Sequence, residues 1–203
     1  MGNRAVITAR GAQVGVYLHW NGGRDSIEAF LRYCELAELP PLNRNMSGFV
    51  QFVTVITNFF RNDGGSIDLV PVEPRHLSPS SPGDNGVYVV DRYKIVDRVS
   101  APRVEQREHS MRDMLRAIDT AQPARDQLGD YLEGREIATE DLKVGDQVWL
   151  RDFGIEASRF ALYAVSGVTD TGQLFVDRFP HQDNARNPNS WISGATVRVP
   201  SAA

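Results

Sequence analysis

One short run of residues gathers an imidazole, an indole, an amide and a guanidinium around two glycines. The run is His19-Trp20-Asn21-Gly22-Gly23-Arg24, and it lies between a predicted strand and a predicted helix. Backbone N–H groups at a glycine turn and at a helix N-terminus attract anions. A guanidinium there can grip a phosphate or carboxylate with two parallel hydrogen bonds. The pattern predicts a ligand-binding corner that consists of Arg4, His19, Trp20, Asn21, Gly22, Gly23 and Arg24.

A purely structural interpretation of the same corner stays open. Asp25 follows directly and, as the expected N-cap of the helix, would place a negative charge where an anion would sit. The glycine spacing matches neither a phosphate-binding loop nor a dinucleotide-binding fold. In this interpretation Trp20 packs into the protein and His19 bonds to backbone. A pocket at His19 on which Arg4 and Arg24 converge would instead indicate a ligand site.

A second candidate is the most basic stretch of the chain, residues 92–116, which holds seven basic and four acidic residues. It could follow a phosphate backbone, with Tyr93 as a stacking partner for a base. The acidic residues among the basic ones favour an ordinary solvated surface instead. If nucleic acid binds, the predicted contacts are Arg92, Arg103, Arg107, Arg112 and Arg116.

The sequence predicts no catalytic residue, no metal site and no cofactor. Cys34 is the only cysteine, and it falls on the apolar face of a predicted helix, where a thiol acts as a small hydrophobic group. The four histidines lack the spacing of zinc ligands. The Gly-x-Ser-x-Gly motif of serine hydrolases is absent. Enzyme activity is left open, and a non-enzymatic role is favoured.

Composition narrows the classes of partner. The 203 residues contain 22 Lys and Arg against 26 Asp and Glu, a formal charge of −4. This balance argues against broad electrostatic binding to nucleic acid or to an anionic membrane. The chain contains no signal peptide pattern and no apolar run long enough to cross a bilayer. We therefore expect a cytoplasmic protein without a membrane partner, and the oligomeric state stays open.

The elements that position the corner follow from local patterns. Residues 3–8 and 14–20 are predicted to pair as strands across a turn at residues 11–13. Asp25-Ser26-Ile27-Glu28 matches a capping box, so a helix should start there and end before Pro40. A second helix is predicted over residues 47–61, because apolar residues recur at helical spacing although β-branched residues favour a strand.

The next elements are less regular. Residues 66–73 are predicted to form a strand that Pro71 places near a sheet edge. Residues 74–86 are expected to form an exposed loop, and residues 86–99 one long strand or a bent pair around Asp91-Arg92. Ser110 can cap a short helix, and a further helical piece is predicted over residues 123–133.

From residue 137 onward the pattern changes to short strands separated by turns. The predicted strands follow Val144-Gly145-Asp146 and cover residues 160–168, 174–179 and 195–199, with a turn at 170–172. Such a series predicts a small open barrel, and its beginning resembles SH3-like barrels at the level of fold alone. The predicted class is α+β: a mixed or antiparallel sheet with two packed helices (1–100), a charged helical connector (101–136) and a barrel-like part (137–203).

Three segments resemble a group of small uncharacterised proteins of bacteria and phages. These proteins open with Met-Gly-x-Arg, here within residues 1–8, and continue to a Tyr-x-His-Trp-Asn-Gly-Gly segment, here within residues 17–26. Residues 84–90 resemble a further segment of the group, so the likeness covers about the first 100 residues. The resemblance implies an accessory protein of phage or mobile-element type, and it implies no reaction.

Three functional hypotheses follow. The first is a non-enzymatic protein that binds a host or phage protein or a nucleoprotein. The second is an enzyme or binder for a phosphorylated small molecule or nucleotide at the corner of residues 19–24. The third is nucleic-acid binding through residues 92–116.

Overall fold

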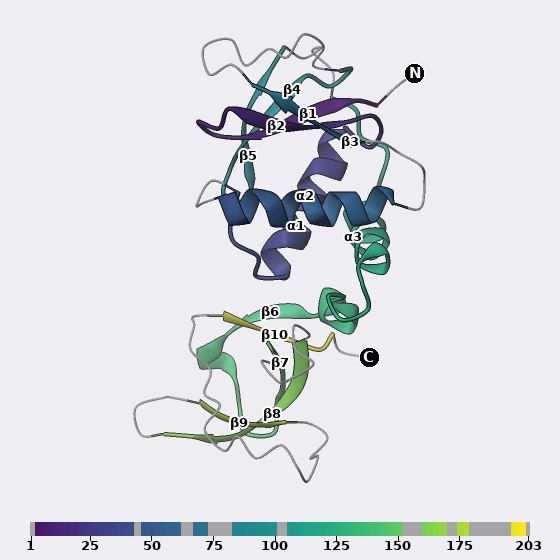
Figure 1. Cartoon of the computed structure of the whole chain (residues 1–203). Helices are drawn as coiled ribbons and strands as arrows, with labels where there is room; N and C mark the ends of the chain where they lie inside the picture. The colour runs from purple at the N-terminus through teal and green to yellow at the C-terminus, as the bar shows by residue number, and fades with distance from the viewer. Residues whose placement is uncertain are drawn as a thin grey trace. The chain divides into compact units, whose positions relative to one another are not determined.

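The computed structural model describes residues 3–42, 46–61, 67–72, 83–100, 105–151, 160–169, 174–178 and 196–201. The chain divides into two compact units, residues 1–123 and 124–203, each with its own sheet (Figure 1). The predicted connector of residues 101–136 is divided between them, because the helix that follows Ser110 packs against the first helix of unit 1. The α+β class is confirmed.

Unit 1 is built on a five-stranded sheet in the order β3-β2-β1-β4-β5. Its strands are β1 (Ala5–Ala9), β2 (Val14–Leu18), β3 (Ile67–Pro71), β4 (Val87–Asp91) and β5 (Lys94–Val99). The central pair, β1 with β4, is parallel, and the other pairs are antiparallel, so the sheet is mixed as predicted. All five residues of β1 are buried, which fits a central strand covered on both faces.

Two helices, α1 (Arg24–Leu36) and α2 (Met46–Phe60), lie on the same side of this sheet (Figure 1). Phe30 of α1 meets Phe59 of α2 edge to face, with ring centroids 5.2 Å apart. The helical period predicted α2 correctly, because Phe52 and Ile56 are buried one turn apart. Burial along that stripe outweighs the strand propensity of the β-branched residues.

The third helix, α3 (Met111–Ala121), begins as predicted at Ser110, whose hydroxyl accepts a hydrogen bond from the Asp113 N–H at 3.1 Å. It packs against α1, where the buried Tyr33 hydroxyl donates to the Asp119 carboxylate at 2.9 Å.

The prediction of a capping box at the start of α1 is wrong. Gly23 is the N-cap, its position makes no side-chain cap hydrogen bond, and the helix begins at Arg24. Asp25 lies inside the first turn of the helix rather than at its cap position. Its Oδ2 accepts hydrogen bonds from two backbone N–H groups far along the chain, those of Glu108 and His109.

The position of β3 at the sheet edge confirms the prediction from Pro71. In an antiparallel pair, alternate residues direct both backbone groups toward the partner strand. Val72 N–H donates to Gln13 C=O at 2.9 Å, so Asp68, Val70 and Val72 face β2. The backbone groups of Ile67, Leu69 and Pro71 therefore point away from the sheet, and the missing N–H of proline removes no ladder bond.

The bent pair predicted over residues 86–99 is confirmed as the hairpin β4–β5. Arg92 in its turn has a φ of +56°, and the register shifts between Val89 and Val90. The loop predicted at residues 74–86 lies outside the described residues except for its last four positions.

Unit 2 contains a five-stranded antiparallel sheet in the order β6-β10-β7-β8-β9. The strands are β6 (Arg135–Ala138), β7 (Gln147–Arg151), β8 (Phe160–Val168), β9 (Leu174–Arg178) and β10 (Thr196–Val199). The strands β7 to β10 confirm the predicted strands, whereas β6 was not predicted. The predicted turn at residues 170–172 lies outside the described residues. Among the described residues no pairing joins β9 to β6, so the sheet does not close and a barrel is not confirmed.

The helix predicted over residues 123–133 is wrong in type and extent. The structure has a short 3₁₀ helix, η1 (Gly129–Glu133), and a second one, η2 (Thr139–Asp141). The guanidinium of Arg198 organises the end of η1, because its Nε and Nη2 donate to the carbonyls of Tyr131 and Leu132 at 3.1 Å each. The same guanidinium lies 4.9 Å from the centre of the Tyr131 ring, which stacks on Phe160.

Candidate functional site at the strand-helix corner

Residues 19–23 connect β2 to α1 as a sharp corner, as the sequence predicts. Asn21 adopts a φ of +54°, a conformation that asparagine tolerates better than most residues. The Gly22 N–H donates to the Asn3 carbonyl at 2.7 Å, and a Cβ at Gly22 would lie 2.6 Å from the Ala5 nitrogen. Glycine at this position lets the corner pass directly against the beginning of β1.

The two arginines of the predicted site each have carboxylate partners of their own. Arg4 binds Asp84 through two parallel bonds, Nε to Oδ2 at 2.9 Å and Nη2 to Oδ1 at 3.0 Å. Arg24 donates to Glu28 at 2.7 Å and to Glu105 at 2.9 Å. These bonds raise the pKa of both guanidinium groups, and the bond from Arg4 lowers the pKa of Asp84. An incoming phosphate would have to displace carboxylates that are already in place.

A polar segment, residues 105–109, crosses the beginning of α1, and we call it the strap. Asp25 holds it, since its Oδ2 accepts from the backbone N–H groups of Glu108 and His109 at 2.5 and 2.6 Å. The Gln106 carbonyl accepts from the Arg24 N–H at 3.2 Å. A Cβ at Gly23 would lie 2.9 Å from that carbonyl, so the second glycine admits the strap.

Polar side chains continue beneath the strap. The buried Asn85 donates to Asn3 at 2.8 Å and to Gln106 at 2.9 Å. Within the described part of the chain, Asp25 Oδ1, Ser26 Oγ and the Tyr88 hydroxyl are buried without a hydrogen-bond partner. Burial also raises the pKa of Tyr88. Buried groups of this kind are commonly satisfied by internal water.

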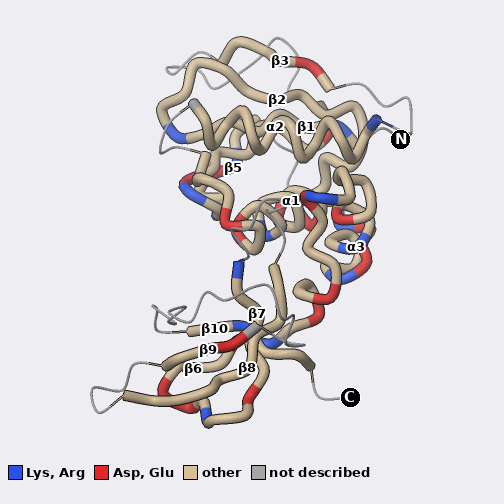
Figure 2. The backbone as a smooth tube through the Cα atoms, turned by 60° about the horizontal axis from the view of Figure 1, so that its bottom comes forward, with Lys and Arg blue, Asp and Glu red and all other residues tan. Residues whose placement is uncertain are grey.

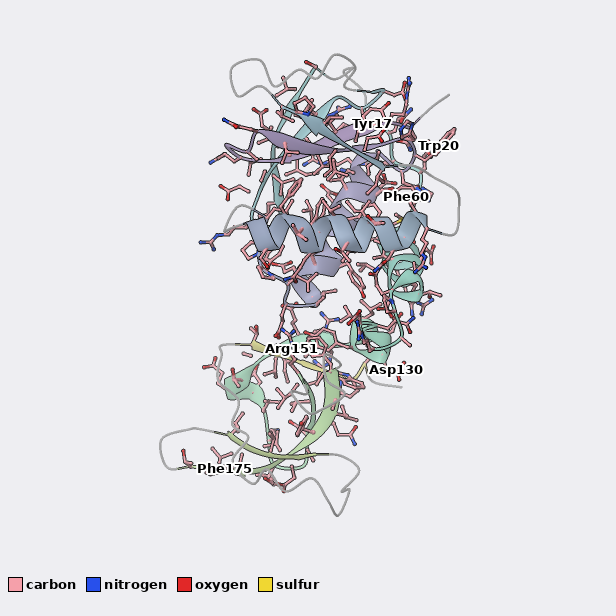
Figure 3. All side chains as sticks on the ribbon, viewed as in Figure 1. Tyr17, Trp20, Phe60, Asp130, Arg151 and Phe175 are labelled. Carbon is pink, nitrogen blue, oxygen red and sulfur yellow. The ribbon has the colours of Figure 1, made fainter. Side chains whose placement is uncertain are left out.

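The outer side of the corner presents Trp20. Its side chain is 55% exposed and projects away from the ribbon (Figure 3), so it does not pack into the protein. His19 lies beside it, with Nε2 3.1 Å from Asp68 Oδ2 and the ring edge to face with Tyr17. His109 Nε2 is 2.9 Å from Asn21 Oδ1. The corner therefore carries an exposed indole and two hydrogen-bonded imidazoles.

The structure distributes the basic stretch over different elements. Arg92 is in the β4–β5 turn, Arg107 is in the strap 3.8 Å from Glu28, and Arg112 and Arg116 are exposed one turn apart on α3. Arg103 lies outside the described residues. Acidic and basic residues alternate around α3 (Figure 2), so this region presents both charges rather than a continuous basic surface.

Sequence reasoning found the corner but missed most of the residues that complete it. Asp68, Asp84, Glu105 and His109 lie 49 to 88 residues from their partners in the corner. Local periodicity carries no signal for such pairs. One signal did exist for Asp84, because residues 84–90 form the last of the segments that carry the resemblance, and the structure brings that segment against Asn3 and Arg4.

Comparison with known proteins adds no assignment: no protein-family model, no curated protein and no solved structure matches the chain.

Proposed function

We propose that this protein is a non-enzymatic binding protein that recognises a partner protein through the corner at Trp20. The main support for this proposal is Trp20, which is 55% exposed to solvent at the junction of β2 and α1. Tryptophan is enriched among the residues that dominate binding energy at protein interfaces. An indole can bury a large apolar area while its N–H finds a hydrogen-bond partner.

The charges of the corner support a protein partner rather than a phosphorylated ligand. Arg4 and Arg24, the cations expected to grip an anion, are engaged by Asp84, Glu28 and Glu105. The corner also exposes the indole and part of the His19 and His109 rings. This combination favours contact with an apolar pocket that has a polar rim.

The setting we propose is that of a phage or mobile-element accessory protein acting on a host protein or nucleoprotein. This part of the proposal rests on the resemblance of residues 1–8, 17–26 and 84–90. The contacts of Asn3 and Arg4 with Asn85 and Asp84 place parts of these segments together beside the corner. In the described residues, no helix is long and apolar enough to cross a bilayer.

The experiment uses the tagged chain and two variants of it to capture proteins from a lysate of the cells in which the protein occurs. The captured proteins are then compared among the three. Trp20→Ala removes the proposed anchor, and Val50→Ala changes a side chain on α2 that is equally exposed, at 55%. A partner that binds through the corner should be lost or weakened about 30-fold or more with Trp20→Ala, the effect of a hot-spot residue. It should be retained with Val50→Ala. Equal capture by all three proteins contradicts the proposal.

A further inference from the structure

The edge of the unit 1 sheet beside the corner has backbone groups directed away from β2. In β3 these are the N–H and C=O of Ile67 and Leu69 and the C=O of Pro71, because Asp68 and Val70 bond to β2. The edge begins at the corner, since Ile67 pairs with Leu18 and Asp68 contacts His19.

The two edges of this sheet differ in how they are protected. Three of the six residues of β5 are charged (Lys94, Asp97 and Arg98), a device that discourages pairing with another chain. β3 carries one charged residue, Asp68, which is paired with His19. At its centre the apolar side chain of Leu69 is 61% exposed. Pro71 limits the usable edge to the half that adjoins the corner.

We infer that the partner presents an extended segment that adds to β3 as a further strand, pairing with the backbone of Ile67 and Leu69. This inference deepens the proposed function and rests on it. In strand addition the backbone supplies affinity and alternate side chains supply specificity. The segment carries an apolar side chain on the face of Leu69 and a basic one on the face of Asp68, since cross-strand neighbours of these kinds attract. Its end reaches the exposed Trp20.

The test requires no knowledge of the natural partner. A displayed library of random short linear peptides is selected on the full-length protein, and enriched peptides are synthesised and their Kd measured by calorimetry. Hydrogen exchange then reports whether a peptide protects the Ile67 and Leu69 amides. The inference predicts enriched peptides with alternating apolar and basic residues that slow exchange at both amides.

Two variants remove the edge in different ways. Leu69→Pro deletes an outward N–H without breaking a bond to β2, and Leu69→Lys adds a charge of the kind found on β5. Each should weaken peptide binding about tenfold or more, and circular dichroism with thermal unfolding identifies any variant that fails to fold. Leu69→Lys keeps the test valid if the proline variant is unstable.

The outcomes separate the two proposals. No enriched peptide, or peptides that bind both Leu69 variants normally and leave both amides unprotected, overturns strand addition. Peptides that lose affinity only with Trp20→Ala also overturn it, while they support recognition at the corner. Conversely, a peptide can protect the Ile67 and Leu69 amides while Trp20→Ala captures the partner as well as the unchanged protein does. That result supports strand addition at β3 and refutes recognition through Trp20.

Discussion

Asp25 is expected to hold the strap against α1, and replacing it with alanine tests this role. The variant loses two charge-assisted hydrogen bonds, to the N–H groups of Glu108 and His109 at 2.5 and 2.6 Å. Bonds to a charged group contribute about 1.5–3 kcal/mol each. The freed N–H groups belong to exposed residues and can bond to water, so we expect Asp25→Ala to lower the free energy of unfolding of unit 1 by about 2–4 kcal/mol.

The assay combines urea denaturation of the full chain with hydrogen exchange at the individual amides. Exchange at residues 108 and 109 should accelerate in Asp25→Ala, while amides of the central strand β1 remain protected until global unfolding. Asp25→Asn keeps an acceptor oxygen without the charge and should lose about half as much stability.

Glu35→Ala is the matched control, because Glu35 is an exposed carboxylate of the same helix that pairs with Arg32 at 2.6 Å. An exposed pair of this kind contributes about 0–1 kcal/mol. If Asp25→Ala and Glu35→Ala have equal stability, and the amides of residues 108 and 109 exchange equally fast in both, the role assigned to Asp25 is refuted.

Four further predictions address other parts of the chain. Gly22→Ala should destabilise unit 1 by about 1–3 kcal/mol, because the new Cβ would meet the Ala5 nitrogen at 2.6 Å; thermal unfolding measures this, and an unchanged Tm would show that the corner can move. Burial raises the pKa of Cys34 to about 12, so the folded protein should resist a thiol reagent at pH 8 and react only on unfolding. Since the folded state favours the neutral thiol, the associated stability is present below the ordinary pKa of about 8.5 and declines as the pH rises from there toward about 12; Cys34→Ala should remove that slope in alkaline denaturation. In unit 2, Arg198→Met should leave the carbonyls at the end of η1 without a donor and lower the free energy of unfolding by about 2–4 kcal/mol. A loss below about 0.5 kcal/mol in urea denaturation would mean that water replaces the guanidinium.

The features that the sequence predicted correctly are those that interactions between residues close in sequence determine. Alternation and a turn placed β1 and β2, helical spacing of Phe52 and Ile56 placed α2, and Pro71 marked an edge strand. The misses share a different cause. The carboxylate of Asp25 matched a local cap, yet it binds amides 83 and 84 residues away, and such a pairing leaves no local trace.

The candidate site shows the same division. Residue types in the run from His19 to Arg24 correctly indicated a corner between a strand and a helix. They could not indicate that Asp84 would pair with Arg4 and Glu105 with Arg24, because any of the 26 acidic residues could have been the partner. Charge partners are assigned by the topology of the sheet, which brings residue 84 next to residue 4.

The parallel pairing of β1 with β4 has a consequence for synthesis on the ribosome. Val6 and Arg10 donate their N–H groups to Gly86 and Val90, so one side of β1 has no backbone partner until some eighty more residues have been synthesised. Strand pairings over such sequence distances form slowly, and until then the unpaired apolar strand can associate with other chains. The nascent chain should therefore depend on chaperones that shield short β-prone segments, and slowing translation before residue 86 should increase its aggregation.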